Sequence, residues 1–279
     1  MRSTPHVVVG AVAACGLAAT LIATARLAAQ DTFPPKSDLQ LQLHELVEDH
    51  AMDGTCGPPG DPPANKKASR AQNRAKNNFF VEGDPVTITQ GVFRLLQKRT
   101  EDRSIPHGSD NALPADRSIL ANFLNDRGVM LGEGTLVRFA TRVIDAHFSN
   151  KSKGESVNCH ETGEEGNDIH IVLSQNQSDD ECDSVTAEIS PHFRPEIWTN
   201  IAGLDFENRP VRFTGPLFFD GSHVPCRPGK AINPKRSSIW EIHPVYAIDV
   251  CKSKQMARCK AADDSMWQPF DTWVGAQDQ

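Results

Sequence analysis

The chain of 279 residues lacks the short motifs of several common enzyme classes. It contains no G-x-S-x-G, H-E-x-x-H, G-x-G-x-x-G or P-loop sequence, so the hydrolases, zinc proteases and nucleotide-binding enzymes built on these motifs are not indicated. No C-x-x-C pair occurs, which argues against a zinc knuckle and against a thioredoxin-type redox centre.

The composition is also poor in tyrosine and in positive charge. One Tyr stands against 19 Gly and 19 Pro, which predicts many loops. The net charge of −7 argues against a strongly basic nucleic-acid clamp. A mean hydropathy of −0.43 excludes a multispan membrane protein. With 38% hydrophobic and 23% charged residues, the chain has the composition of a globular protein.

The first 29 residues have the parts of a secretory signal peptide. Arg2 precedes an apolar run over Val7–Ala25, small residues follow, and the first acidic residue is Asp31. This pattern predicts cleavage after Ala29, with Ala25 as the alternative, and a secreted or periplasmic protein. The other interpretation is an uncleaved membrane anchor formed by residues 7–25.

Cysteine usage agrees with export. Six cysteines follow the leader, and an even number in an exported chain predicts three disulfides. Because Cys159 and Cys182 flank a predicted strand over 168–173, we expect them to form one pair. The six candidates are Cys56, Cys159, Cys182, Cys226, Cys251 and Cys259.

Residues 30–130 are predicted to be loop-rich and partly helical. Apolar residues at helical spacing predict helices over 86–100 and 116–127, the second ended by Gly128. Residues 37–50 fit either a helix or a strand, because a capping-box spacing and an alternation of leucines compete there.

From residue 131 the pattern changes to a period of two, typical of strands. The order strand, strand, strand, helix, strand, strand predicts a five-stranded OB-like barrel over 131–252, with a long first strand shared between its two halves. The fold class is therefore mainly β with some α. We expect the tail, 253–279, to pack back through its aromatic residues. The predicted strands are 135–147, 168–173, 184–190, 211–219 and 239–250, the last interrupted by Pro244, and the helix is 194–203.

Several segments within 130–252 resemble those of uncharacterised exported bacterial proteins that carry an OB-like domain. The resemblance implies this fold and a bacterial exported setting, and it implies no activity. The segments that carry it are Gly132–Thr135, Glu155–Cys159, Asn167–Ile171 (NDIHI), Ser190–Pro195 and Trp240–Val245 (WEIHPV).

Two D/E-x-H pairs are the best candidates for chemistry. Residues two apart on a strand share a face, so Asp168 projects with His170, and Glu241 projects with His243. We expect the intervening apolar residues to point into the barrel and the polar pairs to point outward. Two imidazoles and two carboxylates could bind a divalent metal, and Glu188 is the expected partner of a second histidine nitrogen. The alternative is a solvated strand face.

Charged residues are segregated along the chain. Residues 154–188 hold ten acids and no Lys or Arg, which fits solvated loops better than a calcium site. A basic stretch beside Phe79 and Phe80 could serve a polyanion, or could be a flexible solvated segment. Its densest part consists of Lys66, Lys67, Arg70, Arg74 and Lys76.

These patterns lead to three functional expectations. The first is a non-catalytic module that binds an extracellular oligosaccharide, nucleic acid or protein, because OB barrels commonly bind such partners. The second is a metal-dependent hydrolase or nuclease that uses Asp168, His170, Glu241 and His243. The third is a structural envelope protein.

Overall fold

The computed structural model describes residues 33, 46, 48–175, 180–230 and 232–277. The predicted signal peptide, 1–29, lies outside the described residues, as does most of the undecided segment 37–50. Among the residues that are described, no helix is both long and apolar enough to cross a membrane.

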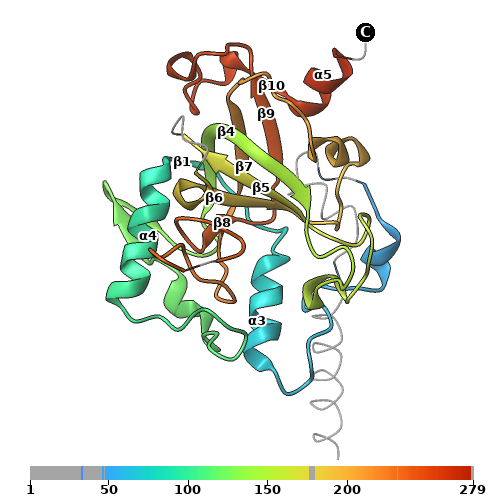
Figure 1. Ribbon diagram of the computed structural model, residues 1–279, viewed down its shortest axis with the longest axis vertical. Helices are drawn as coiled ribbons and strands as arrows, with labels where there is room; N and C mark the ends of the chain where they lie inside the picture. Colours follow the sequence, from blue (N-terminus) through green and yellow to red (C-terminus); the bar gives the residue numbers. More distant parts are fainter. Residues whose placement is uncertain (1–32, 34–45, 47, 176–179, 231, 278–279) are drawn as a thin grey trace, which may run out of the picture.

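Five strands close into a barrel, which confirms the predicted fold class (Figure 1). Around the barrel the order is β4-β5-β6-β8-β7, and β7 pairs with β4 to close it; the β6–β8 pair is parallel. The 3-10 helix η5 lies in the connection between the third and fourth barrel strands, as the sequence predicted. The bounds are β4 Leu136–Phe148, β5 Ile169–Ser174, β6 Val185–Ile189, η5 Glu196–Ile201, β7 Val211–Phe219 and β8 Trp240–Ile242.

Strand β4 is long because it serves both halves of the barrel. Residues 136–141 pair with β7, and residues 142–148 pair with β5. The register shifts between Val143 and Asp145, where an irregularity lets the strand bend from one partner to the other. This is the shared first strand expected from the sequence.

The barrel interior is filled by every second residue of each strand. Ile169, Ile171, Trp240 and Ile242 all belong to one buried apolar cluster, as predicted. The alternation follows from the pleat of a strand, which sends neighbouring side chains to opposite faces.

Helices α3 and α4 and further strands pack outside the barrel (Figure 1). Helix α4, Gln90–Asp102, confirms a helix within 86–100, although β1, Val86–Ile88, precedes it and pairs with β4. Helix α3, Lys67–Lys76, was not predicted.

The helix predicted over 116–127 is wrong. This segment forms a 3-10 turn, η2 (Arg117–Leu120), followed by β2 (Leu124–Asp126), which pairs with β3 (Val129–Leu131). The two loop residues have φ values of 52° at Arg127 and 89° at Gly128, the left-handed geometry of a two-residue hairpin turn. Gly128 therefore turns a hairpin rather than ending a helix.

The C-terminal strands leave the barrel. After Pro244, β9 (Ala247–Cys251) pairs with β7 and with β10 (Trp267–Pro269), and α5 (Phe270–Gly275) follows. Trp267, Phe270 and Trp273 of the tail are buried, which confirms the predicted packing. The remaining elements are 3-10 turns: η1 Ala51–Gly54, η3 Ser156–Asn158, η4 Glu181–Asp183, η6 Met256–Arg258 and η7 Asp264–Met266.

The six cysteines form three disulfides, as predicted, but the expected pair Cys159–Cys182 is wrong. Strand β5 separates these two residues, and its six residues extend roughly 20 Å, whereas bridged Cα atoms lie within about 7 Å. In the fold Cys159 instead lies beside Cys56 and Cys182 beside Cys226, with Cα–Cα distances of 5.8 and 5.5 Å. The observed pairs are Cys56–Cys159, Cys182–Cys226 and Cys251–Cys259.

Candidate functional site

The outward face of β5, β6 and β8 carries the predicted polar residues, but this face is buried. His170 pairs in register with Glu188, and the β6–β8 register places His243 beside Glu188 in turn. Their exposed fractions are 5%, 6% and 0%, and Asp168 and Glu241 are exposed by 1% and 0%. The predicted solvated strand face is therefore wrong, because segments outside the barrel cover these strands.

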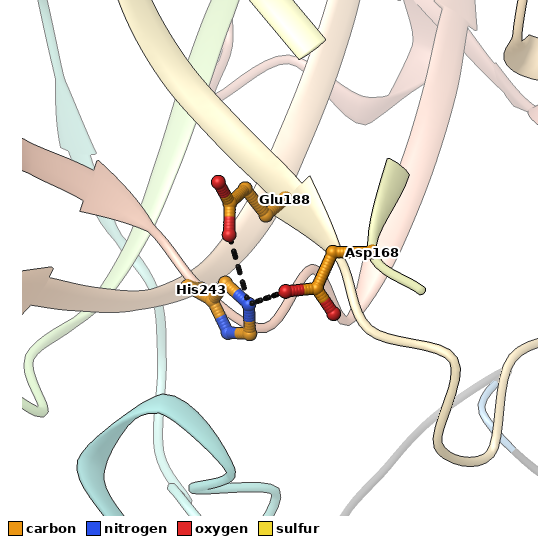
Figure 2. A group of neighbouring side chains, drawn as sticks. All are labelled: Asp168, Glu188 and His243. Atoms are coloured by element: carbon orange, nitrogen blue, oxygen red, sulfur yellow. Dashed lines mark hydrogen bonds and ion pairs between the residues drawn. The ribbon is translucent and has the colours of Figure 1, made fainter. Parts of the chain in front are cut away.

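Three of the predicted residues meet at one point (Figure 2). Nε2 of His243 lies 3.3 Å from Oε2 of Glu188 and 3.5 Å from Oδ2 of Asp168. One ligand atom from each residue lies within 4.8 Å of the other two, a spacing that could hold a metal ion. Asn158 donates to the second oxygen of Asp168 at 3.1 Å, so this carboxylate is fixed from both sides.

Lys76, at the end of α3, supplies a cation at the same point. Its Nζ lies 2.9 Å from Asp168, 3.0 Å from Glu188 and 3.1 Å from Glu155. Its backbone carbonyl accepts a hydrogen bond from Nδ1 of His243 at 2.7 Å. Glu188 was expected to accept from the second nitrogen of a metal-binding histidine; instead Glu188 and Asp168 both face Nε2 of His243, and the carbonyl of Lys76 accepts from Nδ1.

The charges of this cluster stabilise one another. Burial disfavours ionisation of Asp168, but Lys76 and the hydrogen bond to His243 outweigh it and lower its pKa to about 2. The same partners hold the pKa of Glu188 well below its ordinary value. Burial also disfavours the charged forms of Lys76 and His243, yet the carboxylates raise the pKa of Lys76 well above its ordinary value and that of His243 to about 9.

This arrangement limits what a metal ion could do here. A cation needs the carboxylate oxygens that already contact Lys76, and it needs Nε2 of His243 without a proton. A metal would therefore have to displace both the ammonium group of Lys76 and the imidazole proton.

Glu241 and His170 lie beside the cluster without joining it. Oε2 of Glu241 accepts from buried Arg236 at 2.7 Å, and Arg236 also contacts Asp220 at 2.9 Å. Neither ring nitrogen of His170 has a hydrogen-bond partner among the described residues. Burial lowers the pKa of His170 to about 4, so its ring stays neutral. Of the two D/E-x-H pairs, Asp168 and His243 therefore meet Glu188 in the cluster, and His170 and Glu241 lie beside it.

A cleft of about 780 Å³ opens beside the cluster. Its floor includes Glu188 and Lys76, and we call it the barrel-face cleft. One wall is α3 and another is the connection from β4 to β5; the β7–β8 connection and two N-terminal loops complete it. Its lining residues are Pro62, Pro63, Lys66, Ser69, Gln72, Asn73, Lys76, Ser109, Asp110, Asn111, Leu113, Asn150, Glu155, Ser156, Val157, His160, Glu188, Asp220, Ser222 and His223.

Hydrogen bonds from α3 join the walls of the barrel-face cleft. Asn73 donates to Ser156 of the β4–β5 connection at 3.3 Å. Gln72 donates to Ser222 of the β7–β8 connection at 2.7 Å and accepts from the backbone of Gly221 at 3.2 Å. One helix therefore holds both barrel connections in place, so the cleft is formed before any ligand arrives.

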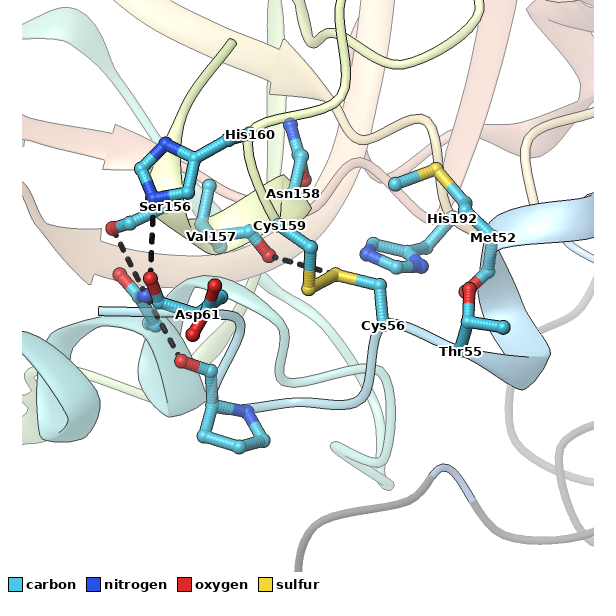
Figure 3. Close-up of a disulfide and its surroundings, with 12 residues drawn as sticks. Met52, Thr55, Cys56, Asp61, Ser156, Val157, Asn158, Cys159, His160 and His192 are labelled. Carbon is cyan, nitrogen blue, oxygen red and sulfur yellow. Dashed lines mark hydrogen bonds between the residues drawn. A yellow bond between two sulfur atoms is a disulfide. The ribbon is translucent and has the colours of Figure 1, made fainter. Parts of the chain in front are cut away.

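A disulfide attaches the N-terminal loop to the same wall (Figure 3). Cys56 bonds to Cys159, and His160 contacts the carbonyl oxygen of Asp61 at 3.1 Å. Gly60 has a φ of 57°, and a Cβ atom there would lie only 2.1 Å from the carbonyl oxygen of Ser156. Only glycine fits this close approach, which explains one glycine of the GPPGDPP segment.

Sequence reasoning missed several residues of this site. It treated Lys76 as part of a solvated or polyanion-binding basic stretch, whereas the side chain of Lys76 is only 12% exposed and lies among acids. Phe79 of that stretch is 1% exposed and packs on Phe193 in the core, so it offers no stacking surface. The other residues of the site could not be recognised as a group because they lie far apart in the sequence. They are Glu155, Asp220, His223 and Arg236.

Comparisons with known proteins identify no relative. No protein-family model matches the chain, and neither a curated protein nor a solved structure does. The barrel itself agrees with the fold that the resemblance implied, and the bacterial exported family remains an expectation.

Proposed function

We propose that this protein is a non-catalytic extracellular module that binds an oligosaccharide in the barrel-face cleft. The observation that carries the proposal is the place of the cleft on the barrel. In OB folds, the face of strands two and three, together with the connections one–two and four–five, binds oligonucleotides and oligosaccharides. The corresponding parts here are β5, β6 and the β4–β5 and β7–β8 connections, and the last three contribute lining residues.

The lining favours a sugar over a nucleic acid. Asp110, Glu155, Glu188 and Asp220 are acidic, against the two lysines Lys66 and Lys76, so a phosphate backbone would be repelled. None of the lining residues is Phe, Tyr or Trp, so the cleft lacks the aromatic platforms on which bases stack. Amide, hydroxyl and carboxylate groups instead suit the hydroxyls of a sugar.

The second candidate, a metal-dependent hydrolase or nuclease, has one observation in its favour. Asp168, Glu188 and His243 converge at a spacing that suits a metal ion. Lys76 contacts both carboxylates, which weakens this candidate relative to the binding module. Metal analysis of purified protein separates the two candidates, because the hydrolase requires a bound divalent ion.

The setting we propose is secreted or periplasmic. Three disulfides are consistent with an oxidising compartment. The apolar leader supports export, by cleavage near Ala29 or as an anchor over 7–25.

Calorimetric titration with neutral oligosaccharides tests the proposal. We expect Ser69→Tyr to abolish binding, because Ser69 lines the cleft from α3 and a larger side chain would fill it. Lys67→Tyr is the matched control, since Lys67 is exposed on the same helix and does not line the cleft. Unchanged affinity in Ser69→Tyr, with a folded protein by circular dichroism, would contradict the proposal.

A further inference from the structure

We propose that the oligosaccharide bound in the barrel-face cleft carries free amino groups, as in a polymer of amino sugars. This inference rests on the proposed function. It follows from which polar groups of the cleft are already used within the protein and which remain for a ligand.

The strongest hydrogen-bond donors of the cleft are engaged. Nζ of Lys66 donates to Asn111 at 2.6 Å, and Nζ of Lys76 lies against three carboxylates. The amide nitrogen of Asn73 donates to the carbonyl oxygen of Pro59 at 2.9 Å, and that of Gln72 donates to Ser222. A ligand that offers mainly acceptors would therefore find few partners.

Acceptors remain available at both ends of the cleft. Asp110 is exposed at the rim, and its carboxylate has no hydrogen bond or ion pair with any described residue. Glu188 lines the floor and is 6% exposed; its Oε2 atom is engaged by Lys76 and His243, whereas its Oε1 atom has no hydrogen bond or ion pair with any described residue. Both carboxylates can thus accept from a ligand.

His223 adds a third acceptor in the neutral form of its ring. Its Nδ1 lies 2.5 Å from Oδ2 of Asp220, which also contacts buried Arg236 and is therefore held as an anion. In the neutral ring the proton then resides on Nδ1, which leaves Nε2 as an acceptor. The side chain of His223 is 40% exposed, so a ligand in the cleft can reach it.

An ammonium group complements this set. It offers three donors and no acceptor, and its charge is attracted by the excess of carboxylates around the cleft. Hydroxyl groups of the sugar ring can donate to the remaining acceptors. A uronic acid would place a carboxylate beside Glu188 and Asp110, so we expect it to be rejected.

Titration with three oligomers of equal length tests the inference: glucosamine, N-acetylglucosamine and galacturonate. We expect the glucosamine oligomer to bind about tenfold more tightly than the acetylated one, as one added charge-assisted hydrogen bond would give. Added salt should reduce this preference, and galacturonate should not bind. Equal affinity for the acetylated and free amines would overturn the inference and leave the proposed function standing. Absence of binding by all three would overturn both.

A pair of variants tests whether Asp110 is responsible for the preference for glucosamine. Asp110→Asn keeps the shape of the rim and removes its charge, so we expect it to lose most of the preference for glucosamine over N-acetylglucosamine. Asp84→Asn removes an exposed carboxylate outside the cleft and serves as the control. The same loss in both variants would show that overall charge, rather than Asp110, sets the preference.

Discussion

Nδ1 of His243 donates a hydrogen bond to the backbone carbonyl of Lys76 at 2.7 Å, although 167 positions separate the two residues. This bond turns Nε2 toward Asp168 and Glu188. It also joins the end of α3 to the residue that follows β8. The protonation state of the His243 imidazole is thereby coupled to the packing of α3 against the barrel.

Folding stability should fall as the pH rises toward 9. The pKa of His243 is raised to about 9 in the folded protein, against about 6.5 in the unfolded chain. The imidazolium thus contributes its full stability below about pH 6.5, and this contribution is lost as the pH passes through 9. Urea denaturation at pH 6.5 and 9.5 should show a loss of roughly 2–3 kcal/mol that His243→Gln lacks. His147→Gln, on the exposed part of β4, is the control.

Removing the Lys76 cation should destabilise the protein and admit a metal ion. Lys76→Met leaves Asp168, Glu155 and Glu188 without their shared cation, and a broken buried pair costs about 3–5 kcal/mol. Zn²⁺ or Mn²⁺ should then raise the melting temperature of the variant and not that of the original protein.

Lys98→Met provides the control for this substitution, because Lys98 forms only an exposed pair with Asp102. Stoichiometric metal in the unaltered protein, with Lys76 present, would contradict the prediction and favour the hydrolase candidate.

The disulfides should contribute unequally. Cys56–Cys159 spans 103 positions and Cys251–Cys259 spans 8. Loop-closure entropy predicts roughly 4–5 kcal/mol for the first and roughly 2–3 kcal/mol for the second. Double Cys→Ala variants of each pair, compared by urea denaturation, check this order. Unreduced peptide mapping should first recover the three observed pairs, and a Cys159–Cys182 peptide would refute them.

The barrel could be predicted from the sequence because its strands alternate cleanly. In β6, for example, Val185, Ala187 and Ile189 face the core. The helix between the third and fourth strands favours an OB-like barrel over other five-stranded arrangements. The hairpin at Arg127 could not be predicted, because the apolar residues of 116–127 recur at helical spacing and the pairing of β2 with β3 overrode that signal. The local residue pattern thus predicted a helix or strand correctly only where pairing with another segment did not favour a different structure.

The candidate site could be predicted only in part. The D/E-x-H pairs showed which side chains share an outward strand face, and three of the five candidate residues do meet. The covering helix could not be foreseen, because α3 is polar along most of its length and Lys76 resembles its solvated neighbours. Burial of that lysine depends on carboxylates from three separate segments, which only the tertiary fold brings together.

The parallel pairing of the short strand β8 with β6 also bears on when the chain can fold. β8 spans Trp240–Ile242 and lies between β6 and β7. Until it is in place, both of those strands present unpaired edges, which are prone to pair with other chains. Such non-local pairings form slowly. Closure of the barrel must therefore wait until nearly the whole polypeptide is available, and a chain shortened before Trp240 should aggregate instead of forming a smaller barrel.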